Sequence, residues 1–412
     1  MNTNAERVAI VGLGYVGLPL AMQVLSTGKK VIGIDISASL IKSLNEGVTN
    51  IEGVNVSDLK LSIESGDFVA TTDYSQISIC RIVVITVPTP LDDEQKPDLS
   101  MLRSACVSIS NHILTGTLVI NESTSFPGTL REFICPIFER NSTEIYETLE
   151  FACSPERVDP GNKIYGFSNT PRNVSGITQT ASKRTYDFYS TFVDNVEIVE
   201  SPEVAELAKL IENSYRLLNI SFVNELKKYC QIKSISLIDA IQAASTKPYG
   251  FAPFWPSAGV GGHCIPVDPR YLIEDAREKG VVLSTLECAS QANILLADDV
   301  AYFCMKILGS LMNKNILVEG IAYKSNVSDV RESAALRIFR ALEERGARVR
   351  WHDPIVETLK VPGFKDIGLS EFDLVVVCVV HDQTNLKEIT DEARLIIDLT
   401  GNVPKAKNTI NF

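Results

Sequence analysis

The segment Arg7-Val-Ala-Ile-Val-Gly-Leu-Gly-Tyr-Val-Gly17 decides the fold of the N-terminal part of this chain. It begins with a short run of β-favouring residues and continues at once into three glycines spaced as G-x-G-x-x-G. Residues 18–27 then have helical spacing, and residues 31–34 form the next apolar run, which ends at Asp35. A strand, this glycine pattern, a helix and an acid after the following strand are typical of a dinucleotide-binding βαβ unit.

Each position of the glycine pattern has its own expected role. Gly12 permits the tight turn, Gly14 lets a pyrophosphate approach the backbone, and Gly17 lets the helix pack closely on the strand. Asp35 can accept hydrogen bonds from a ribose diol and would repel a 2′-phosphate, so the sequence favours NAD over NADP. The bland alternative is a glycine-rich turn followed by an ordinary acid. The expected cofactor-binding residues here are Gly12, Gly14, Tyr15, Val16, Gly17 and Asp35.

The remaining pattern predicts an α/β fold with two doubly wound, Rossmann-like domains joined by a long central helical region. Near-continuous apolar runs separated by helical stretches indicate a parallel sheet that is covered on both faces. Further strands of the first domain are predicted at 68–71, 82–87, 118–121 and 149–153. The second domain is predicted from strands at 315–320, 349–352, 372–380 and 395–398, with a helix at 332–344 that Gly346 ends.

The central region is predicted to be helical from Ser201-Pro202-Glu203 onward. A hydroxyl cap, a proline at the first position and an acid in the first turn favour a helix start, and no Gly or Pro interrupts the pattern until about residue 230. Residues 246–270 are rich in Gly, Pro and aromatic residues and predict a loop. We expect three domains, with bounds 1–199, 200–300 and 301–412, of which the first carries the dinucleotide fingerprint and the second the long helix and the loop with Cys264.

Composition narrows the function classes. The 412-residue chain has a net charge of -12, which argues against a nucleic-acid or membrane-surface partner. Its nine cysteines include no C-x-x-C pair, so no disulfide scaffold or zinc site is expected and a reducing cytoplasm fits. The N-terminus has no signal-peptide pattern, and no apolar run is long enough to span a bilayer. No bound metal is expected.

The segment Gly259-Val-Gly-Gly-His-Cys-Ile-Pro-Val-Asp-Pro269 carries the clearest chemical signal. Most cysteines are small buried hydrophobes, and we interpret the other eight in this way. Cys264 differs because its loop is too polar and glycine-rich to be core. Lys209 and Asn213 share a helix face, where they would stabilise an oxyanion if they point at Cys264. By pattern alone, a lysine that snorkels along an apolar helix is the more common interpretation.

These residues together resemble the nucleotide-sugar 6-dehydrogenases of the UDP-glucose/GDP-mannose dehydrogenase family, over essentially the whole chain. The resemblance rests on ordered motifs: Gly12-Leu-Gly-Tyr-Val-Gly-Leu-Pro, Val87-Pro-Thr-Pro, Glu122-Ser-Thr, Ser154-Pro-Glu-Arg, Ala208-Lys-Leu-Ile-Glu-Asn213, Gly261-Gly-His-Cys-Ile-Pro-Val-Asp268 and Gly320-Ile-Ala-Tyr-Lys-Ser. It implies that a sugar C6 alcohol is oxidised to a carboxylate with two NAD+ reduced. It also implies that 1–199 binds NAD, that 200–300 is a helical dimerisation region with the catalytic cysteine loop, and that 301–412 binds the UDP-sugar. The same resemblance implies a homodimer or a larger homo-oligomer.

The resemblance implies a role for each matching residue. Cys264 would form a thiohemiacetal and then a thioester, and Asp268 would act as the base through a water. Lys209 and Asn213 would stabilise the oxyanion, Thr124 would orient water, and Glu156 would lie near the substrate or its hydrolytic water. Further cofactor contacts implied are Pro88, Thr89, Thr124 and Arg331. Substrate contacts implied are Glu156, Arg157, Lys209, Asn213, Tyr249, Gly250, Gly261 and Lys324.

Substrate choice is indicated by departures from the UDP-glucose pattern. Pro160, His263 and Val267 replace an acid, a tyrosine and a lysine, and Arg157 is new. This resembles the branch that acts on UDP-N-acetylhexosamines, so UDP-GlcNAc or UDP-GalNAc is expected, for surface polysaccharide synthesis. UDP-ManNAc and UDP-glucose are alternatives within the family. Alternatives from other classes are a two-electron NAD-dependent dehydrogenase with a structural Cys264 and a non-catalytic NAD sensor.

Overall fold

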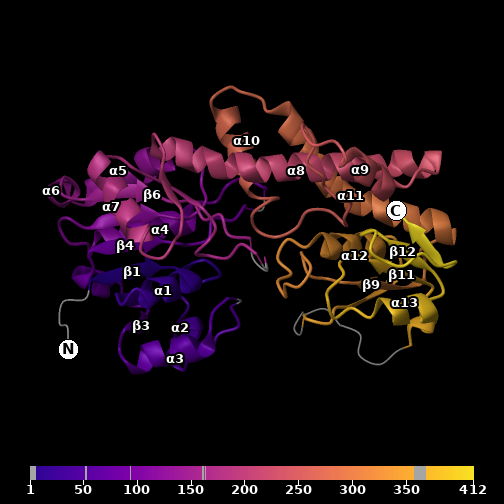
Figure 1. Cartoon of the computed structure of the whole chain (residues 1–412), viewed down its shortest axis with the longest axis horizontal. Helices are drawn as coiled ribbons and strands as arrows, with labels where there is room; N and C mark the ends of the chain where they lie inside the picture. Colours follow the sequence, from indigo (N-terminus) through magenta and orange to yellow (C-terminus); the bar gives the residue numbers. More distant parts are fainter. Residues whose placement is uncertain (1–5, 52, 93, 160–161, 163, 357–367) are drawn as a thin grey trace. The chain divides into compact units, whose positions relative to one another are not determined.

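The computed structural model describes residues 6–51, 53–92, 94–159, 162, 164–356 and 368–412 (Figure 1). The chain divides into two compact units, which we describe separately. The first comprises Met1–Ile211 with Arg270–Asp275, and the second Glu212–Pro269 with Ala276–Phe412.

The first unit is built on a sheet whose described strands run in the order β3-β2-β1-β4-β5-β6-β7-β8. Strands β1 to β6 are parallel, β7 is antiparallel to β6, and β8 is parallel to β7. The order reverses between β1 and β4, where such sheets bind ligands at their carboxyl ends. The strands are β1 Arg7–Val11, β2 Lys30–Ile34, β3 Phe68–Thr71, β4 Ile82–Ile85, β5 Leu118–Asn121, β6 Glu150–Cys153, β7 Arg172–Gly176 and β8 Val196–Ile198.

Helices cover both faces of this sheet, as the alternation of side chains along β1 requires. Val8 and Ile10 join the core beneath α1 and α7, whereas Ala9 and Val11 join the core beneath α4 and α5. Apolar side chains from the strands and the helices thus fill both sides of the sheet, in keeping with a buried parallel sheet. The helices are α1 Gly17–Ser26, α2 Ala38–Asn45, α3 Val56–Glu64, α4 Ser100–Ser110, α5 Cys135–Asn141, α6 Thr143–Tyr146 and α7 Gln179–Tyr189.

The second unit holds a smaller parallel sheet in the order β10-β9-β11-β12-β13. Helices α11 and α12 pack on one face, and α13 packs on the other (Figure 1). The strands are β9 Asn315–Glu319, β10 Arg348–His352, β11 Leu374–Val377, β12 Ile396–Asp398 and β13 Thr409–Asn411. The helices are α9 Leu237–Ala244, α11 Ser284–Leu308, α12 Ala334–Glu344 and α13 Leu386–Glu392. Helices α8 Pro202–Lys233 and α10 Asp268–Glu278 contribute residues to both units.

The predicted fold class is confirmed, with differences at several element ends. The strand predicted to reach Val87 ends at Ile85, because Pro88 and Pro90 follow and a proline has no N–H for a sheet. The strand predicted over 372–380 is only 374–377. The helix predicted from 332 begins at Ala334, capped by the Ser333 hydroxyl.

Two further expectations were wrong. The loop predicted over 246–270 ends earlier, because Asp268 begins α10; an acid followed by Pro269 favours a helix start. Cys288, expected to be buried, is exposed on α11, whereas Cys80, Cys106, Cys135, Cys153, Cys230, Cys304 and Cys378 are buried.

Within the described residues, no helix is both long and apolar enough to cross a membrane.

Candidate active site

The glycine pattern lies at the carboxyl end of β1, beside the residues that follow β4. Gly12 has φ +96°, and a Cβ added there would lie 2.8 Å from the Thr86 carbonyl oxygen. A Cβ at Gly17 would lie 1.8 Å from the Gly12 carbonyl oxygen. At Gly14, by contrast, a Cβ would meet no atom within 4 Å. The first and third glycines are therefore needed by the protein, and the second leaves open space for a ligand.

Asp35 directly follows the next strand, β2, at the position expected for a ribose-binding acid. Its carboxylate accepts N–H bonds from Leu13, at 2.9 Å, and Ser37, at 2.9 Å. The side chain is half-buried, so oxygen lone pairs remain for a ligand. Open space at Gly14, the start of α1 and this carboxylate together fit NAD.

Other predicted residues follow neighbouring strands at the same edge. Pro88 is exposed and Thr89 half-buried after β4, and Thr124 is half-buried after β5. Because β4 and β5 are paired in parallel, both segments lie at one edge of the sheet. The expected cofactor edge is thus assembled from three strands.

A cluster of buried charged side chains lies where β5 and β6 end and β7 begins. Arg172, on β7, pairs with Glu122, after β5, at 3.0 Å and also with Glu156, after β6. Tyr189 donates its hydroxyl to Glu122 and packs its ring against the guanidinium, with 4.8 Å between the Arg172 Cζ and the ring centre. Burial raises the pKa of Glu122 to about 7, although Arg172 opposes the shift. Two acids thus share one cation out of water.

Glu156 is anchored at every polar atom of its side chain. One carboxylate oxygen pairs with Arg172, and the other accepts N–H bonds from Arg157, at 2.7 Å, and Val158, at 2.5 Å. Burial favours a higher pKa for Glu156, but Arg172 and these N–H groups outweigh it and hold the pKa below its usual value. The Glu156 carbonyl accepts a bond from the Lys209 ammonium. This arrangement suits an ionised anchor for Lys209.

Arg157 is a different case from Arg172. Its guanidinium donates to the Pro171 carbonyl at 2.9 Å, and its backbone N–H donates to Glu156. Glu156 takes its ion pair from Arg172, which the sequence interpretation did not consider. The neighbouring Pro160, whose identity suggested the substrate branch, lies outside the described residues.

In the second unit, α8 and the start of α10 bring Asn213 and Asp268 together. The Asn213 amide donates to the Asp268 carboxylate at 2.5 Å, and Asp268 is buried. The Asp268 backbone N–H donates to the Cys264 carbonyl at 2.8 Å. The half-buried Cys264 therefore lies one turn before the acid, and one short segment carries a nucleophile type and a base type.

The cysteine loop, residues 259–267, packs against the segment that follows β9. A Cβ at Gly261 would lie 2.8 Å from the Glu332 carbonyl oxygen, and one at Gly262 would lie 2.9 Å from the Tyr323 ring. The Gly262 N–H also donates to the Arg331 carbonyl at 3.2 Å. The glycine pair is thus required by a close approach of two loops.

The remaining predicted contacts are more exposed. Lys324 is half-buried, and the exposed Arg331 makes a forked pair with Asp329 at 2.6–3.0 Å. Tyr249 is 72% exposed, and Gly250 follows it with φ +67°. The structure therefore shows no closed pocket wall at Tyr249 within the described residues.

The sequence did not predict the ion pair of Arg172 with Glu122 or the contact of Tyr323 with the cysteine loop. One signal was available: Arg172 opens the strand Arg-Asn-Val-Ser-Gly in an otherwise apolar sheet. A charged residue in such a strand must be paired when it is buried. Tyr323 gave no signal, because its partner glycines are 61 residues away or more in sequence.

Family models match most of the chain. The UDP-glucose/GDP-mannose dehydrogenase family, NAD binding domain, matches residues 6–193; the central domain of that family matches 203–294, and its UDP binding domain matches 317–405.

Individual relatives agree with this. The chain is 32% identical to a UDP-N-acetyl-D-glucosamine 6-dehydrogenase of Pseudomonas aeruginosa, over 95% of this chain and 96% of that protein. It is 31% identical to a UDP-N-acetyl-D-mannosamine dehydrogenase of Methanococcus maripaludis, over 100% and 93%. The solved UDP-D-ManNAc dehydrogenase of Pyrococcus horikoshii superposes with a TM-score of 0.88 at 29% identity, covering 98% of both chains. The chain belongs to the UDP-glucose/GDP-mannose dehydrogenase family and is an NAD-dependent nucleotide-sugar dehydrogenase.

Proposed function

We propose that this protein oxidises the C6 alcohol of a UDP-N-acetylhexosamine, UDP-GlcNAc or UDP-GalNAc, to the uronate for surface polysaccharide synthesis. The proposal places the enzyme in the cytoplasm, where nine free thiols persist. Relatives named for N-acetylglucosamine and N-acetylmannosamine support an N-acetylated sugar. NAD+, when bound, supplies the hydride acceptor for each of two oxidations.

One observation carries the proposal: Asn213, Asp268 and Cys264 are held together by two hydrogen bonds. A simple alcohol dehydrogenase needs a base but no thiol. A reaction that continues from aldehyde to carboxylate needs a nucleophile that keeps the aldehyde bound and makes it oxidisable again. The placement of an acid and a thiol within one turn supports the second kind of reaction.

The proposed chemistry balances over the two oxidations. Asp268 takes the C6 hydroxyl proton through a water as the first hydride leaves, giving the aldehyde. The Cys264 thiolate then adds to the aldehyde carbon, and the oxyanion gains a proton to give a thiohemiacetal. Loss of a second hydride and a proton gives a thioester. Water adds to it, the carbon–sulfur bond breaks, and the products are a carboxylate, the free thiolate and two protons released to solvent.

Other residues have supporting roles in this proposal. Lys209 and Asn213 stabilise the oxyanion; an amide carries two N–H groups, so the bond to Asp268 leaves one for a substrate oxygen. Thr124 orients water. Glu156 stays ionised against Arg172 and acts beside the substrate mainly by holding Lys209 through its carbonyl.

We further propose which residues hold the ligands, in a chain divided into domains 1–199, 200–300 and 301–412. Cofactor contacts are Gly12, Gly14, Tyr15, Val16, Gly17, Asp35, Pro88, Thr89, Thr124 and Arg331. Substrate contacts, besides the catalytic residues, are Arg157, Tyr249, Gly250, Gly261 and Lys324. The cations among them suit a diphosphate.

The test incubates the protein and NAD+ separately with UDP-GlcNAc, UDP-GalNAc, UDP-ManNAc and UDP-glucose, and follows NADH and product mass. We expect two NADH per UDP-N-acetylhexosamine consumed. Cys264→Ser should abolish carboxylate formation, whereas the matched Cys288→Ser, at the exposed cysteine of α11, should leave it unchanged. Normal carboxylate formation by Cys264→Ser would contradict the covalent route.

The same assay separates the alternatives. One NADH per sugar, with an aldehyde product, would indicate a two-electron dehydrogenase. Turnover of UDP-ManNAc or UDP-glucose alone would keep the mechanism and change the substrate. NAD binding without turnover of any sugar would favour the sensor.

We also propose that the protein forms a homodimer or larger homo-oligomer through α8. This helix leaves a row of apolar side chains 43–60% exposed at spacings of four and seven residues: Val204, Ile211, Tyr215, Phe222 and Tyr229. Such spacing places them along one side of the helix, where a second copy can cover them. Phe222→Glu should lower the molar mass measured by light scattering to that of one chain. An unchanged mass would contradict this surface.

A further inference from the structure

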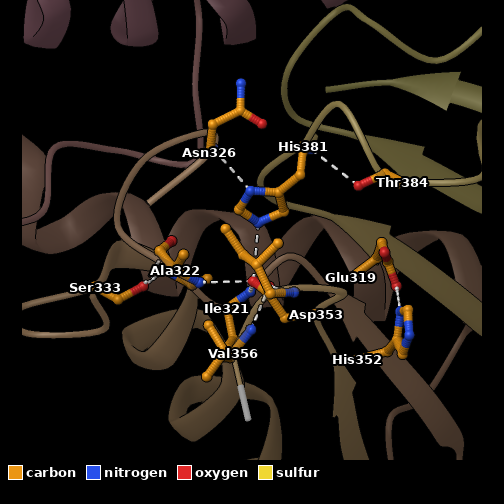
Figure 2. Close-up of polar contacts among 12 residues, drawn as sticks. Glu319, Ile321, Ala322, Asn326, Ser333, His352, Asp353, Val356, His381 and Thr384 are labelled. Atoms are coloured by element: carbon orange, nitrogen blue, oxygen red, sulfur yellow. Dashed lines mark hydrogen bonds and ion pairs between the residues drawn. The ribbon is translucent and has the colours of Figure 1, made fainter. Parts of the chain in front are cut away.

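A buried histidine and a buried aspartate meet at the carboxyl edge of the second sheet (Figure 2). Asp353 follows β10, and His381 lies beyond β11, on the two sides of β9. Both side chains are fully inaccessible, and the His381 Nε2 lies 3.0 Å from the Asp353 Oδ2. This is the point where the strand order reverses, so loops that bind a ligand are expected here.

The Asp353 carboxylate is fully used inside the protein. One oxygen accepts N–H bonds from Ile321, at 2.8 Å, and Ala322, at 3.1 Å, and the other accepts two from residues 355–356. Burial favours a higher pKa for Asp353, but His381 and the N–H groups outweigh it and hold the pKa below its ordinary value. The aspartate is therefore an anion that fixes the first residues after β9.

Asp353 and Asp35 differ in how many hydrogen bonds their carboxylates accept within the protein and in how exposed they are. Asp35 follows the equivalent strand of the first sheet, accepts two N–H bonds and is half-buried. Asp353 accepts four N–H bonds and an imidazole contact, and its side chain has no exposed surface. It is thus an internal support, with no room for a ribose hydroxyl.

The contacts of His381 determine its tautomer. The backbone N–H of Asn326 donates to the His381 Nδ1 at 2.8 Å, so Nδ1 must present a lone pair. The proton of the neutral ring then lies on Nε2 and points at Asp353. Asn326 has φ +61°, and its side chain accepts the N–H of Asp382 at 2.9 Å. The loop after β9 is therefore tied to the loop after β11 from both sides.

The loop held in this way contacts the cysteine loop. Residues 320–332, which we call the β9 loop, place the Tyr323 ring under Gly262, and the Arg331 carbonyl accepts the Gly262 N–H. The same loop carries Lys324. A shift at Asn326 would therefore move both the candidate diphosphate contacts and the support beneath Cys264.

We propose that His381 is a positioning residue for UDP binding. It fixes the β9 loop because its Nδ1 accepts the backbone N–H of Asn326 while its Nε2–H donates to the Asp353 carboxylate. The inference rests on the proposed function, because it takes Lys324 and Arg331 as nucleotide contacts. His381 itself is buried and acts through the loop.

Two substitutions separate the two bonds of His381. In His381→Asn the amide oxygen replaces Nδ1 and keeps the acceptor for Asn326, whereas in His381→Gln the amide nitrogen replaces Nε2 and keeps the donor to Asp353. UDP affinity is measured by calorimetry, with NAD+ affinity measured in parallel. His352→Gln is the matched control, because His352 pairs with Glu319 at the same edge, at 2.8 Å, and is 43% exposed.

We expect His381→Gln to raise the Kd for UDP about tenfold, the size of one lost hydrogen bond to a buried N–H. His381→Asn should stay near the wild-type value for UDP, and its NAD+ affinity should be unchanged. Wild-type UDP affinity in His381→Gln would overturn the inference. Failure of wild-type protein to bind UDP would instead overturn the proposed function.

A spectroscopic measurement on the unsubstituted protein is independent of variant folding. In an NMR spectrum of the ¹⁵N-histidine-labelled protein, the ring signals that are absent from His381→Asn are assigned to His381. These signals should show an unprotonated Nδ1 and a protonated Nε2. A protonated Nδ1 on that ring would also overturn the inference, whatever the variants do.

Discussion

The guanidinium of Arg172 lies between the carboxylates of Glu122 and Glu156, which follow two neighbouring strands of the first sheet. One cation from β7 thus holds the ends of β5 and β6 together. Through Glu156 the same contact sets the carbonyl that binds Lys209. The ionic cluster therefore links the stability of the sheet to the placement of a candidate catalytic lysine.

Replacing Arg172 alone should destabilise the protein more than replacing Arg172, Glu122 and Glu156 together. Arg172→Met leaves two acids buried without their partner, so we expect the free energy of unfolding to fall by about 3–5 kcal/mol. Urea unfolding followed by circular dichroism measures the loss. Adding Glu122→Gln and Glu156→Gln to Arg172→Met should recover part of it. A single Arg172→Met variant as stable as the parent would show that the pairs are not formed in solution.

Gly12 and Gly14 should respond in opposite ways to alanine. Gly12→Ala should destabilise the protein, because φ is +96° and the new Cβ would lie 2.8 Å from the Thr86 carbonyl oxygen. Gly14→Ala should keep the parent's melting temperature, because its Cβ meets nothing within 4 Å, and yet lose NAD+ affinity because the methyl group fills the space for the pyrophosphate. Calorimetry with NAD+ tests this, and undiminished binding to Gly14→Ala would place the cofactor elsewhere.

Asp35 should control the choice between the two nicotinamide dinucleotides. Asp35→Asn keeps one oxygen, so it retains the bond from either the Leu13 or the Ser37 N–H, which bind different carboxylate oxygens, and it removes the charge that repels a 2′-phosphate. We expect the preference for NADH over NADPH, measured as a ratio of Kd values by fluorescence, to fall about tenfold. The exposed Asp73, a helix cap, gives a control in Asp73→Asn. An unchanged ratio in Asp35→Asn would exclude this role.

Lys227 should make stability depend on pH. It is buried in the second unit and donates to the carbonyls of Ser257, at 2.7 Å, and Leu399, at 3.2 Å. Burial lowers its pKa to about 7. Between pH 7 and the unfolded value of 10.5 the unfolded chain binds more protons, so this contribution to stability rises with pH.

Lys227→Met isolates that contribution. The stability of the parent relative to the variant should increase by about 1.4 kcal/mol per pH unit across this window. Urea unfolding of both proteins at pH 7, 8 and 9, in reducing buffer, gives the slope. A difference that does not change with pH would mean that the lysine keeps an ordinary pKa in the folded state.

The sequence predicted features that depend on local pattern. The buried strands on either side of the glycine pattern and the start of α8 at Pro202 are set by residues close together in the chain, and the structure confirms them. Arg172 with Glu122, and Tyr323 with Gly262, are contacts between distant segments, and no local period records them. The antiparallel β7 was missed because its sequence, Arg-Asn-Val-Ser-Gly, is mostly polar and lacks the apolar run of the predicted strands. The assignment of Glu156 as an acid came from resemblance, which does not reveal how its carboxylate is occupied.

The distribution of thiols makes the protein convenient for site-specific labelling. Seven cysteines are buried, Cys264 is half-buried in its loop, and Cys288 is exposed on α11. Maleimide dyes react with accessible thiolates, so the folded chain should offer one fast site and one slower site. After Cys288→Ser, a fluorophore would attach selectively at the candidate nucleophile, and its emission would report ligand arrival without any turnover. The same two thiols provide a ready pair of attachment points for distance measurements within the second unit.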